Sequence, residues 1–353
     1  MTEVEIDWRL PEHRRELFVR YALWEIYTRG QSGSVYSFLP AHAEERGLDE
    51  YQRLWLAWLS ASTHNPVSDV PLLDASADGL HPEGAIQFWR EKYADLRWDK
   101  DRRYVKKSFG PATEEFLASP ASDPETWRRA ADGGWDGVWD LATSVPTMGR
   151  LGAWWFSEVV RILLPEFNLP DADTLLLGDK SGSRSHRNGL AYVAGYDSAP
   201  KWGPADADML GLVPMLEDLG ADLRDEIRAR GGNDSLPLAG YLTLETALCA
   251  FKGFTTARRR YPNVYVDEFY YGIRAGEKVW GHRYETLWRA RARDVADYAL
   301  LERRPMDPGL HADKHDLYRL HGGIVNMGYV WGDMYGDLDR RIAAGEYGRR
   351  ADA

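Results

Sequence analysis

The sequence has little cysteine and no long apolar run. Its 353 residues include one cysteine, Cys249, which excludes an intrachain disulfide, a four-thiolate zinc site and an iron–sulfur cluster held by four cysteines. No stretch approaches the roughly 18 uncharged apolar residues that a membrane span needs. The first 14 residues carry four acids and no apolar segment, so no signal peptide is predicted. We therefore expect a soluble cytoplasmic protein in which Cys249 is an inert core thiol.

Basic residues are too few to balance the acids. There are 44 Lys and Arg against 55 Asp and Glu, a net charge of −11, which argues against a polyanion partner for the chain as a whole. The basic residues nevertheless gather at 90–107, 180–190 and 252–260. If folding brings these windows together, they form a basic face suited to nucleic acid. The alternative is three separate solvated helix faces.

Most of the chain has the spacing of amphipathic helices. Apolar residues recur at i, i+3 and i+4, and Pro or Gly stands where such helices would end. The clearest segments are 17–27, 51–59, 84–96, 153–164, 242–251 and 284–301. We predict an all-α protein, with at most a short strand at 174–177. The 15 tryptophans fall mostly on apolar stripes and are predicted to lie in the core.

The domain organisation follows from composition. We expect an N-terminal extension at residues 1–16, one helical domain at 17–340 and a polar tail at 341–353. Residues 198–236 are rich in Asp, Gly and Pro and are predicted to be an insertion with one short acidic helix.

A candidate phosphate-binding turn lies at residues 145–153, of sequence VPTMGRLGA. A turn with Pro and Gly at the start of a helix directs backbone N–H groups toward an anion. It resembles the hairpin of helix-hairpin-helix DNA-binding proteins, but Thr147 stands where that pattern has glycine. An ordinary helix start is the alternative. The predicted DNA contacts are Thr147, Gly149, Arg150, Arg102 and Arg103.

A carboxylate and a group of cations follow. Apolar residues 175–177 lead to Asp179, in the place where helix-hairpin-helix glycosylases carry their catalytic aspartate; Asp171 and Asp173 are the other candidates, and a plain loop or helix-cap role is the alternative. The next residues, KSGSRSHRN at 180–188, combine hydroxyls, cations and a histidine, as a multiply charged phosphate requires. His186 could donate a proton to a departing group or only hydrogen-bond to it.

A third group of charged residues lies at 245–268. On one helix, Glu245 and Lys252 would face a shared cavity, with Cys249 one turn from each. The segment RRRYP at 258–262 would bind phosphate, with Asp267 or Glu268 as counter-ion or acid–base group. A solvated basic turn paired with those carboxylates is the alternative. The predicted phosphate ligands of the whole chain are Lys180, Ser181, Ser183, Arg184, Ser185, Arg187, Lys252, Arg259 and Arg260.

These segments, together with WDKDRRY at 98–104 and YVWGDMYG at 329–336, resemble the alpha-glutamyl/putrescinyl thymine pyrophosphorylase family over residues 17–336. These proteins are phage-type amino acid:DNA transferases on a helix-hairpin-helix DNA glycosylase-like scaffold. The resemblance implies that this chain acts in the cytoplasm of an infected or bacterial cell on DNA whose 5-hydroxymethyluracil carries a pyrophosphate. An amine, from an amino acid or a polyamine, then displaces the pyrophosphate from the flipped base.

The residue chemistry fits such a reaction. A departing pyrophosphate needs cations, and the attacking amine needs a base, for which Asp179 is the first candidate and Asp267 or Glu268 the second. The sequence shows no His/Cys metal cluster, and a divalent ion accompanying the pyrophosphate stays an open alternative. Two other functions stay open: a helix-hairpin-helix base-excision glycosylase and a non-catalytic DNA-binding helical protein.

Overall fold

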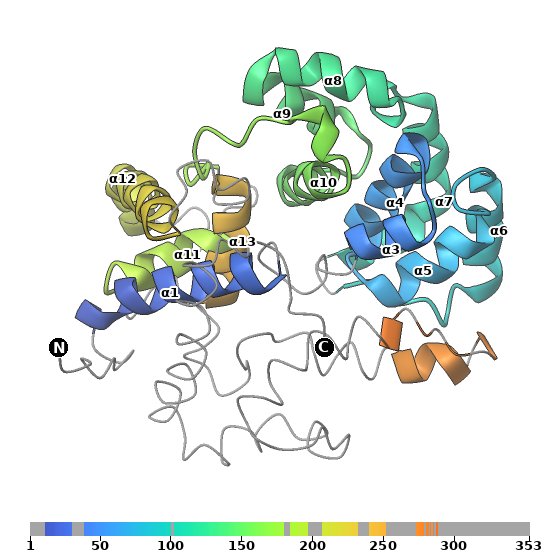
Figure 1. The fold of residues 1–353 in the computed structure, drawn as a ribbon, viewed down its shortest axis with the longest axis horizontal. Helices are drawn as coiled ribbons and strands as arrows, with labels where there is room; N and C mark the ends of the chain where they lie inside the picture. Colours follow the sequence, from blue (N-terminus) through green and yellow to red (C-terminus); the bar gives the residue numbers. More distant parts are fainter. Residues whose placement is uncertain are drawn as a thin grey trace. The chain divides into compact units, whose positions relative to one another are not determined.

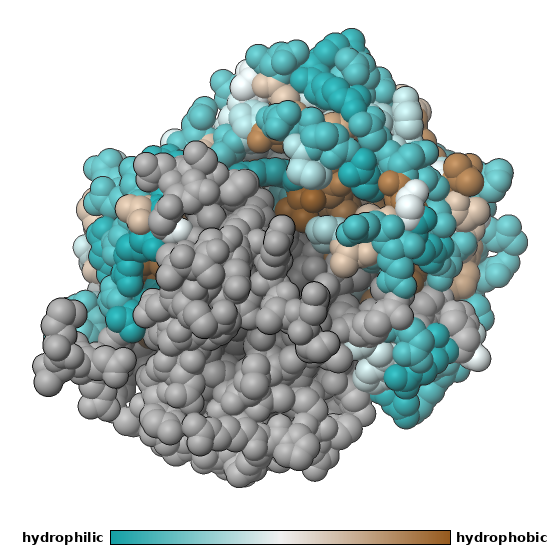
Figure 2. Space-filling view, viewed as in Figure 1, coloured by the Kyte–Doolittle hydropathy of each residue, from teal (hydrophilic) through white to brown (hydrophobic). Residues whose placement is uncertain are grey.

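The computed structural model describes residues 11–29, 39–99, 102–179, 184–196, 207–231, 240–251, 273–278, 280, 281, 283, 285, 287 and 288 (Figure 1). Every regular element in these ranges is helical, and none is a strand, which confirms the all-α prediction for this part of the chain. None of the described helices is both long enough and apolar enough to cross a bilayer. The surface of the described residues in Figure 2 is mostly hydrophilic, in keeping with a charged fraction of 28%.

The chain divides into two compact units. The first unit comprises Met1–Ser37, Ala172–Asp267 and Ala292–Ala353, and the second comprises Phe38–Asp171 and Glu268–Arg291. The second unit therefore interrupts the first at two places, with a long segment after the first helix and a short one after Asp267.

The second unit is a bundle of short helices around α4 and α10. Its main elements are α3 (Leu39–Glu45), α4 (Glu50–Thr63), α5 (Pro66–Ala75), α6 (Pro82–Lys92), α7 (Arg103–Ala118), η2 (Pro120–Ser122), α8 (Pro124–Asp132), α9 (Gly134–Ser144), α10 (Arg150–Leu163) and η3 (Pro165–Phe167). Helices α4 and α10 pack on each other and are buried over most of their length.

Aromatic rings fill the core of the second unit. The ring of Trp58 in α4 stacks on Phe116 of α7, with centroids 4.6 Å apart and planes 5° apart. Phe156 of α10 meets Trp127 of α8 edge to face, with centroids 5.1 Å apart. Such contacts add to the free energy gained by burying the rings. Tryptophans of this unit are largely buried, as predicted.

Local signals in the sequence explain where these helices begin. Asp49 accepts a hydrogen bond from the N–H of Gln52, and the Gln52 side chain accepts one from the N–H of Asp49, which forms a capping box at the start of α4. Asn65 and Asp123 cap α5 and α8, and each is followed by proline at the first helical position.

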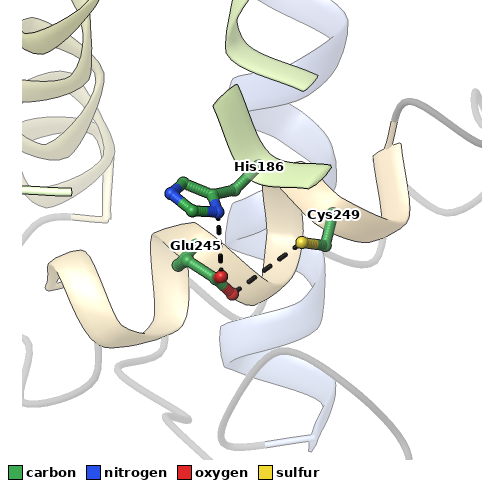
Figure 3. Close-up of side chains that lie close together, drawn as sticks. All are labelled: His186, Glu245 and Cys249. Atoms are coloured by element: carbon green, nitrogen blue, oxygen red, sulfur yellow. Dashed lines mark hydrogen bonds and ion pairs between the residues drawn. The ribbon is translucent and has the colours of Figure 1, made fainter. Parts of the chain in front are cut away.

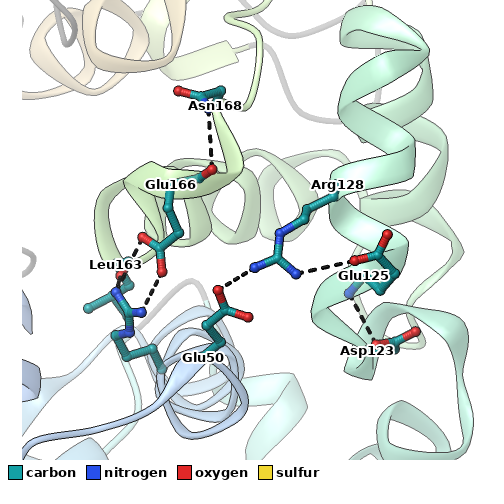
Figure 4. Close-up of polar contacts among 8 residues, drawn as sticks. Glu50, Asp123, Glu125, Arg128, Leu163, Glu166 and Asn168 are labelled. Carbon is teal, nitrogen blue, oxygen red and sulfur yellow. Dashed lines mark hydrogen bonds and ion pairs between the residues drawn. The ribbon is translucent and has the colours of Figure 1, made fainter.

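Ion pairs join elements of the second unit that are distant in sequence (Figure 4). Arg53 of α4 donates to the carbonyl of Leu163 over 3.0 Å and pairs with Glu166 of η3. Arg128 of α8 pairs with Glu50 at the start of α4. These pairs hold α4 against both neighbours.

The described helices of the first unit are α1 (Pro11–Arg29), α11 (Arg184–Val193), α12 (Ala207–Arg230) and α13 (Tyr241–Phe251), and residues 172–179 precede α11. Helix α1 begins at Pro11, within the predicted N-terminal extension. Helix α12 lies in the predicted insertion and is longer than expected; its residues Leu216, Leu223 and Ile227 are buried. Phe251 of α13 packs on Phe18 of α1, with ring centroids 5.1 Å apart.

Ion pairs join α1 and α12. Arg15 pairs with Glu226 over 2.9 Å, and Arg230 pairs with Glu16 over 2.6 Å. Burial alone would raise the pKa of Glu16, but hydrogen bonds from Arg230 and Arg20 outweigh it, so the pKa lies below its ordinary value. Because the folded-state pKa is lowered, this network contributes stability above the ordinary pKa of a glutamate and loses it as the pH falls.

Candidate functional site

The segment that leads to Asp179 is held by a carboxylate of α12. The backbone N–H groups of Leu175 and Leu177 donate to the Oε2 and Oε1 atoms of Glu217, over 3.1 and 2.8 Å. Both leucine side chains are fully buried, and Leu176 between them has a φ of +53°. Because Glu217 takes the donors that a neighbouring strand would use, residues 174–177 do not form the short strand that the sequence allowed.

Asp179 follows this segment at the end of a turn. Its side chain is half-buried, and its N–H donates to the carbonyl of Leu176 over 3.1 Å. Of the other two aspartates, Asp173 is exposed, and Asp171 is paired with Arg161 over 2.9 Å in the second unit. Asp179 thus stands on a fixed backbone, and its role as a base stays a prediction.

Two of the basic residues after Asp179, Arg184 and Arg187, lie in the first turn of α11. Residues 180–183 lie outside the described part of the chain. Arg184 is exposed and Ser185 half-buried at a helix N-terminus, where N–H groups favour anions. Arg187, in contrast, is fully buried, and its Nη1 donates to the carbonyl of Leu177 over 3.2 Å. This cation therefore supports the backbone that precedes Asp179.

His186 lies on the buried side of α11 and meets two residues of α13 (Figure 3). Its Nδ1 is 2.9 Å from Oε1 of Glu245, and the Sγ of Cys249 is 3.8 Å from Oε2 of the same carboxylate. The side chains of His186 and Glu245 are 0% and 1% exposed. The Nε2 of His186 is 3.1 Å from the carbonyl oxygen of Leu175. The histidine thus connects α13 to the segment before Asp179.

The partner of Glu245 in the structure differs from the one that the sequence predicts. The helical spacing groups Glu245 with Lys252, which lies outside the described residues, whereas the structure pairs Glu245 with His186 of another helix. The two residues are far apart in sequence, so no local pattern links them.

A glycine allows α11 and α13 to approach closely beside this cluster. A Cβ atom at Gly189 would lie 2.2 Å from the carbonyl oxygen of Leu248. Only glycine fits this crossing, which brings His186 within reach of Glu245.

The predicted turn in the second unit joins α9 to α10. The N–H of Met148 donates to the carbonyl of Val145 over 3.0 Å, and Thr147 has a φ of +68°. Proline at the second position and a positive φ at the third are typical of a type II turn, in which glycine is preferred at the third. The departure from glycine that the sequence showed at Thr147 therefore falls on the residue with the left-handed backbone.

Arg102 holds this turn from inside. The Arg102 side chain is fully buried. Its Nη1 donates to the Tyr104 hydroxyl over 2.6 Å and to the Thr147 carbonyl over 3.4 Å. Its Nη2 lies 3.2 Å from the sulfur of Met148. The Tyr104 hydroxyl also donates to the Thr147 carbonyl, over 3.2 Å. Arg102, which the sequence predicts to contact DNA, thus stabilises the turn by hydrogen bonds from the buried side.

The other predicted DNA contacts differ in exposure. Gly149 and Arg103 are exposed, and Thr147 is half-buried. Arg150 is 6% exposed, and its guanidinium lies over the Trp154 ring, 5.1 Å from the centroid. Gly149 and Arg103 are therefore the most accessible of these residues.

Thr147→Gly is expected to stabilise the protein. A β-branched residue with a left-handed backbone is strained by about 1–2 kcal/mol, and glycine offsets part of that gain because it loses about 0.5–1 kcal/mol more on folding. A net increase of up to about 1 kcal/mol in the free energy of unfolding should be measurable by urea denaturation. Gly149→Ala, at a φ of −65° with open space around the new methyl group, is the matched control and should show no such gain.

Asp69 is a buried carboxyl group that sequence reasoning missed. It lies in the first turn of α5, 0% exposed, and accepts a hydrogen bond from the Thr63 hydroxyl. Burial raises its pKa from 3.8 to about 8, although hydrogen bonds from Thr63 and Ser60 act in the opposite direction. Nearby in the chain, His64 stacks on Trp155, with ring centroids 3.5 Å apart. No local pattern in the sequence marks Asp69 as buried.

Asp69→Asn is expected to flatten the pH dependence of stability. The folded protein keeps Asp69 protonated up to about pH 8, whereas the unfolded chain ionises it near 3.8. The stability that protonation contributes is therefore complete below the ordinary pKa and is lost as the pH rises toward 8. Urea denaturation at pH 5, 6.5 and 8 should show the variant gaining relative to the parent as the pH increases. A difference that stays constant with pH would contradict this assignment.

Several predicted site residues lie outside the described part of the chain. They are Lys180, Ser181, Ser183, Lys252, Arg259, Arg260, Asp267 and Glu268.

Comparison with known proteins gives one informative likeness. No protein-family model matches the chain, and no solved structure matches it. Among curated proteins, the chain is similar to the serinyltransferase of Salmonella phage ViI, with 24% identity over 364 residues that cover 93% of this chain and 87% of that protein. The likeness thus extends over nearly the full length of both chains.

Proposed function

We propose that this protein is an amino acid transferase that replaces the pyrophosphate of 5-hydroxymethyluracil-pyrophosphate in DNA with an amine nucleophile. The observation that carries the proposal is the likeness to a phage serinyltransferase over 93% of the chain. That relative supports an amino acid as co-substrate. The DNA target rests on the turn at 145–149 and on the family resemblance of the sequence motifs.

The first unit offers the groups for the chemical step. The amine attacks the exocyclic methylene carbon; a C–N bond forms, the C–O bond to pyrophosphate breaks, and the pyrophosphate leaves with the electron pair. Asp179 takes the proton that the amine loses. Arg184 and the N–H groups at the start of α11 can stabilise the charge of the leaving group. In this proposal Arg187 and Glu217 hold the backbone before Asp179 from inside.

The second unit offers a surface for the DNA backbone. Gly149 is exposed at the start of α10, where N–H groups can donate to a phosphate, and Arg103 is exposed at the start of α7. Arg102 stabilises the turn that presents Gly149.

The test is transfer of labelled serine to DNA that carries 5-hydroxymethyluracil-pyrophosphate. Mass spectrometry of the digested nucleosides should show a serine adduct of thymidine, with one pyrophosphate released per adduct. DNA with unactivated 5-hydroxymethyluracil is the matched control and should remain unchanged. Unmodified nucleosides with every common amino acid and polyamine would overturn the proposal, and abasic sites would replace it with a glycosylase.

A further inference from the structure

We infer that His186, Glu245 and Cys249 form a binding site for a divalent transition metal ion, with zinc the best match. One ligand atom from each residue can be chosen so that all three lie within 4.8 Å of one another. His186 comes from α11, while Glu245 and Cys249 lie one turn apart on α13 and face it (Figure 3). This inference does not rest on the proposed function.

The spacing of the ligand atoms suits a small tetrahedral ion. With metal–ligand distances of about 2.0–2.3 Å, ligand atoms around zinc stand roughly 3.3–3.7 Å apart. The distance from His186 Nδ1 to Glu245 Oε1 is 2.9 Å, and the distance from Cys249 Sγ to Glu245 Oε2 is 3.8 Å. Because the three chosen atoms lie within 4.8 Å of one another, side-chain adjustments of up to about 1 Å are needed to reach the spacing around zinc.

The hydrogen bonding of His186 supports a metal at Nδ1. A backbone carbonyl can only accept, so the 3.1 Å contact to Leu175 means that Nε2 carries a hydrogen. A neutral ring then directs the lone pair of Nδ1 at Glu245 Oε1, which is also an acceptor. A cation or a shared proton must lie between them. Histidine ligands of metals commonly donate their other N–H to a backbone carbonyl, as His186 does.

The ligand types select the class of metal. A thiolate and an imidazole favour zinc or cobalt over magnesium and calcium, which prefer oxygen. Three protein ligands leave a fourth position for water or a bound molecule, as in catalytic zinc sites. Cys249 is half-buried, while the other two side chains are buried, so the thiol is the most accessible of the three ligands. In this proposal Cys249, which the sequence predicts to be an inert core thiol, serves as a metal ligand.

The test is cobalt titration of the full-length protein after chelation and dialysis. We expect one cobalt per chain, with visible bands of tetrahedral cobalt and a near-ultraviolet thiolate-to-cobalt band that zinc abolishes. Cys249→Ser should remove the near-ultraviolet band and weaken binding at least tenfold. Glu245→Gln keeps the shape of the side chain but loses its charge, so it should also weaken binding. His81→Ala, which removes an exposed histidine of the second unit, is the matched control and should bind as the parent does.

Thermal melting separates a metal site from a buried ion pair. Zinc that binds only the folded state raises the melting temperature. At zinc concentrations above the dissociation constant, the increase grows with the logarithm of the zinc concentration. The parent should show this increase and Cys249→Ser should not. Absence of stoichiometric cobalt binding in the parent, or a thiolate band that persists in Cys249→Ser, would overturn the inference and leave His186 and Glu245 as an ion pair.

Discussion

Asp179→Asn is expected to lower kcat for amino acid transfer by about 10²- to 10⁴-fold, the usual contribution of a general base. Asparagine has nearly the same shape as aspartate but cannot accept the proton of the attacking amine. The turn that positions residue 179 depends on the backbone contact to Leu176 and should survive. KM for DNA and for the amino acid should change little, because the lost interaction belongs to the transition state.

The control is Asp218→Asn, which removes an exposed aspartate of α12 in the same unit. It should leave kcat unchanged. Single-turnover transfer of labelled serine to pyrophosphorylated DNA measures both variants. Full activity in Asp179→Asn would exclude Asp179 as the general base and leave Asp267 and Glu268 as the candidates.

Gly189→Ala is expected to reduce the free energy of unfolding by about 3 kcal/mol, the upper end for an overpacked core. The new methyl group would lie 2.2 Å from the carbonyl oxygen of Leu248, and a backbone atom of a packed helix cannot rotate away as a side chain can. Helices α11 and α13 must therefore move apart. Because His186 and Glu245 stand on these helices, cobalt binding should weaken in the same variant.

Urea denaturation measures this loss. Gly211→Ala is the matched control, since Gly211 is exposed on α12 of the same unit and a Cβ there meets nothing within 4 Å. Alanine in an open helical position should stabilise by up to about 1 kcal/mol. Equal stability of Gly189→Ala and the parent would show that the two helices separate at little cost.

Helices were predictable because their signals are local. The apolar spacing at 153–164 and at 242–251 corresponds to α10 and α13. The turn at 145–149 was also recognisable, and its unusual residue, Thr147, is the one with a positive φ. In each case the residues that define the feature are neighbours in sequence.

Burial of charge was not predictable. Arg102 and Arg187 belong to basic windows that suggested solvent or phosphate, yet both are fully buried and donate to backbone carbonyls. The local sequence around an arginine does not distinguish a side chain that faces water from one that donates to a buried carbonyl. The pairing of His186 with Glu245, and the two backbone N–H groups bound by Glu217, likewise depend on how distant helices pack.

The insertion of the second unit within the first affects how the chain folds during synthesis. Helix α1 packs on α11, α12 and α13, yet it leaves the ribosome before the whole stretch from Phe38 to Asp171. At about 5–20 residues per second, the residues between Arg29 and Arg184 take roughly 8–30 s to be made. The longer segment of the second unit, Phe38–Asp171, can begin to fold during this interval, before the helices that pack on α1 have been made. The ion pairs of Arg15 with Glu226 and of Glu16 with Arg230 can form only after α12 has been made.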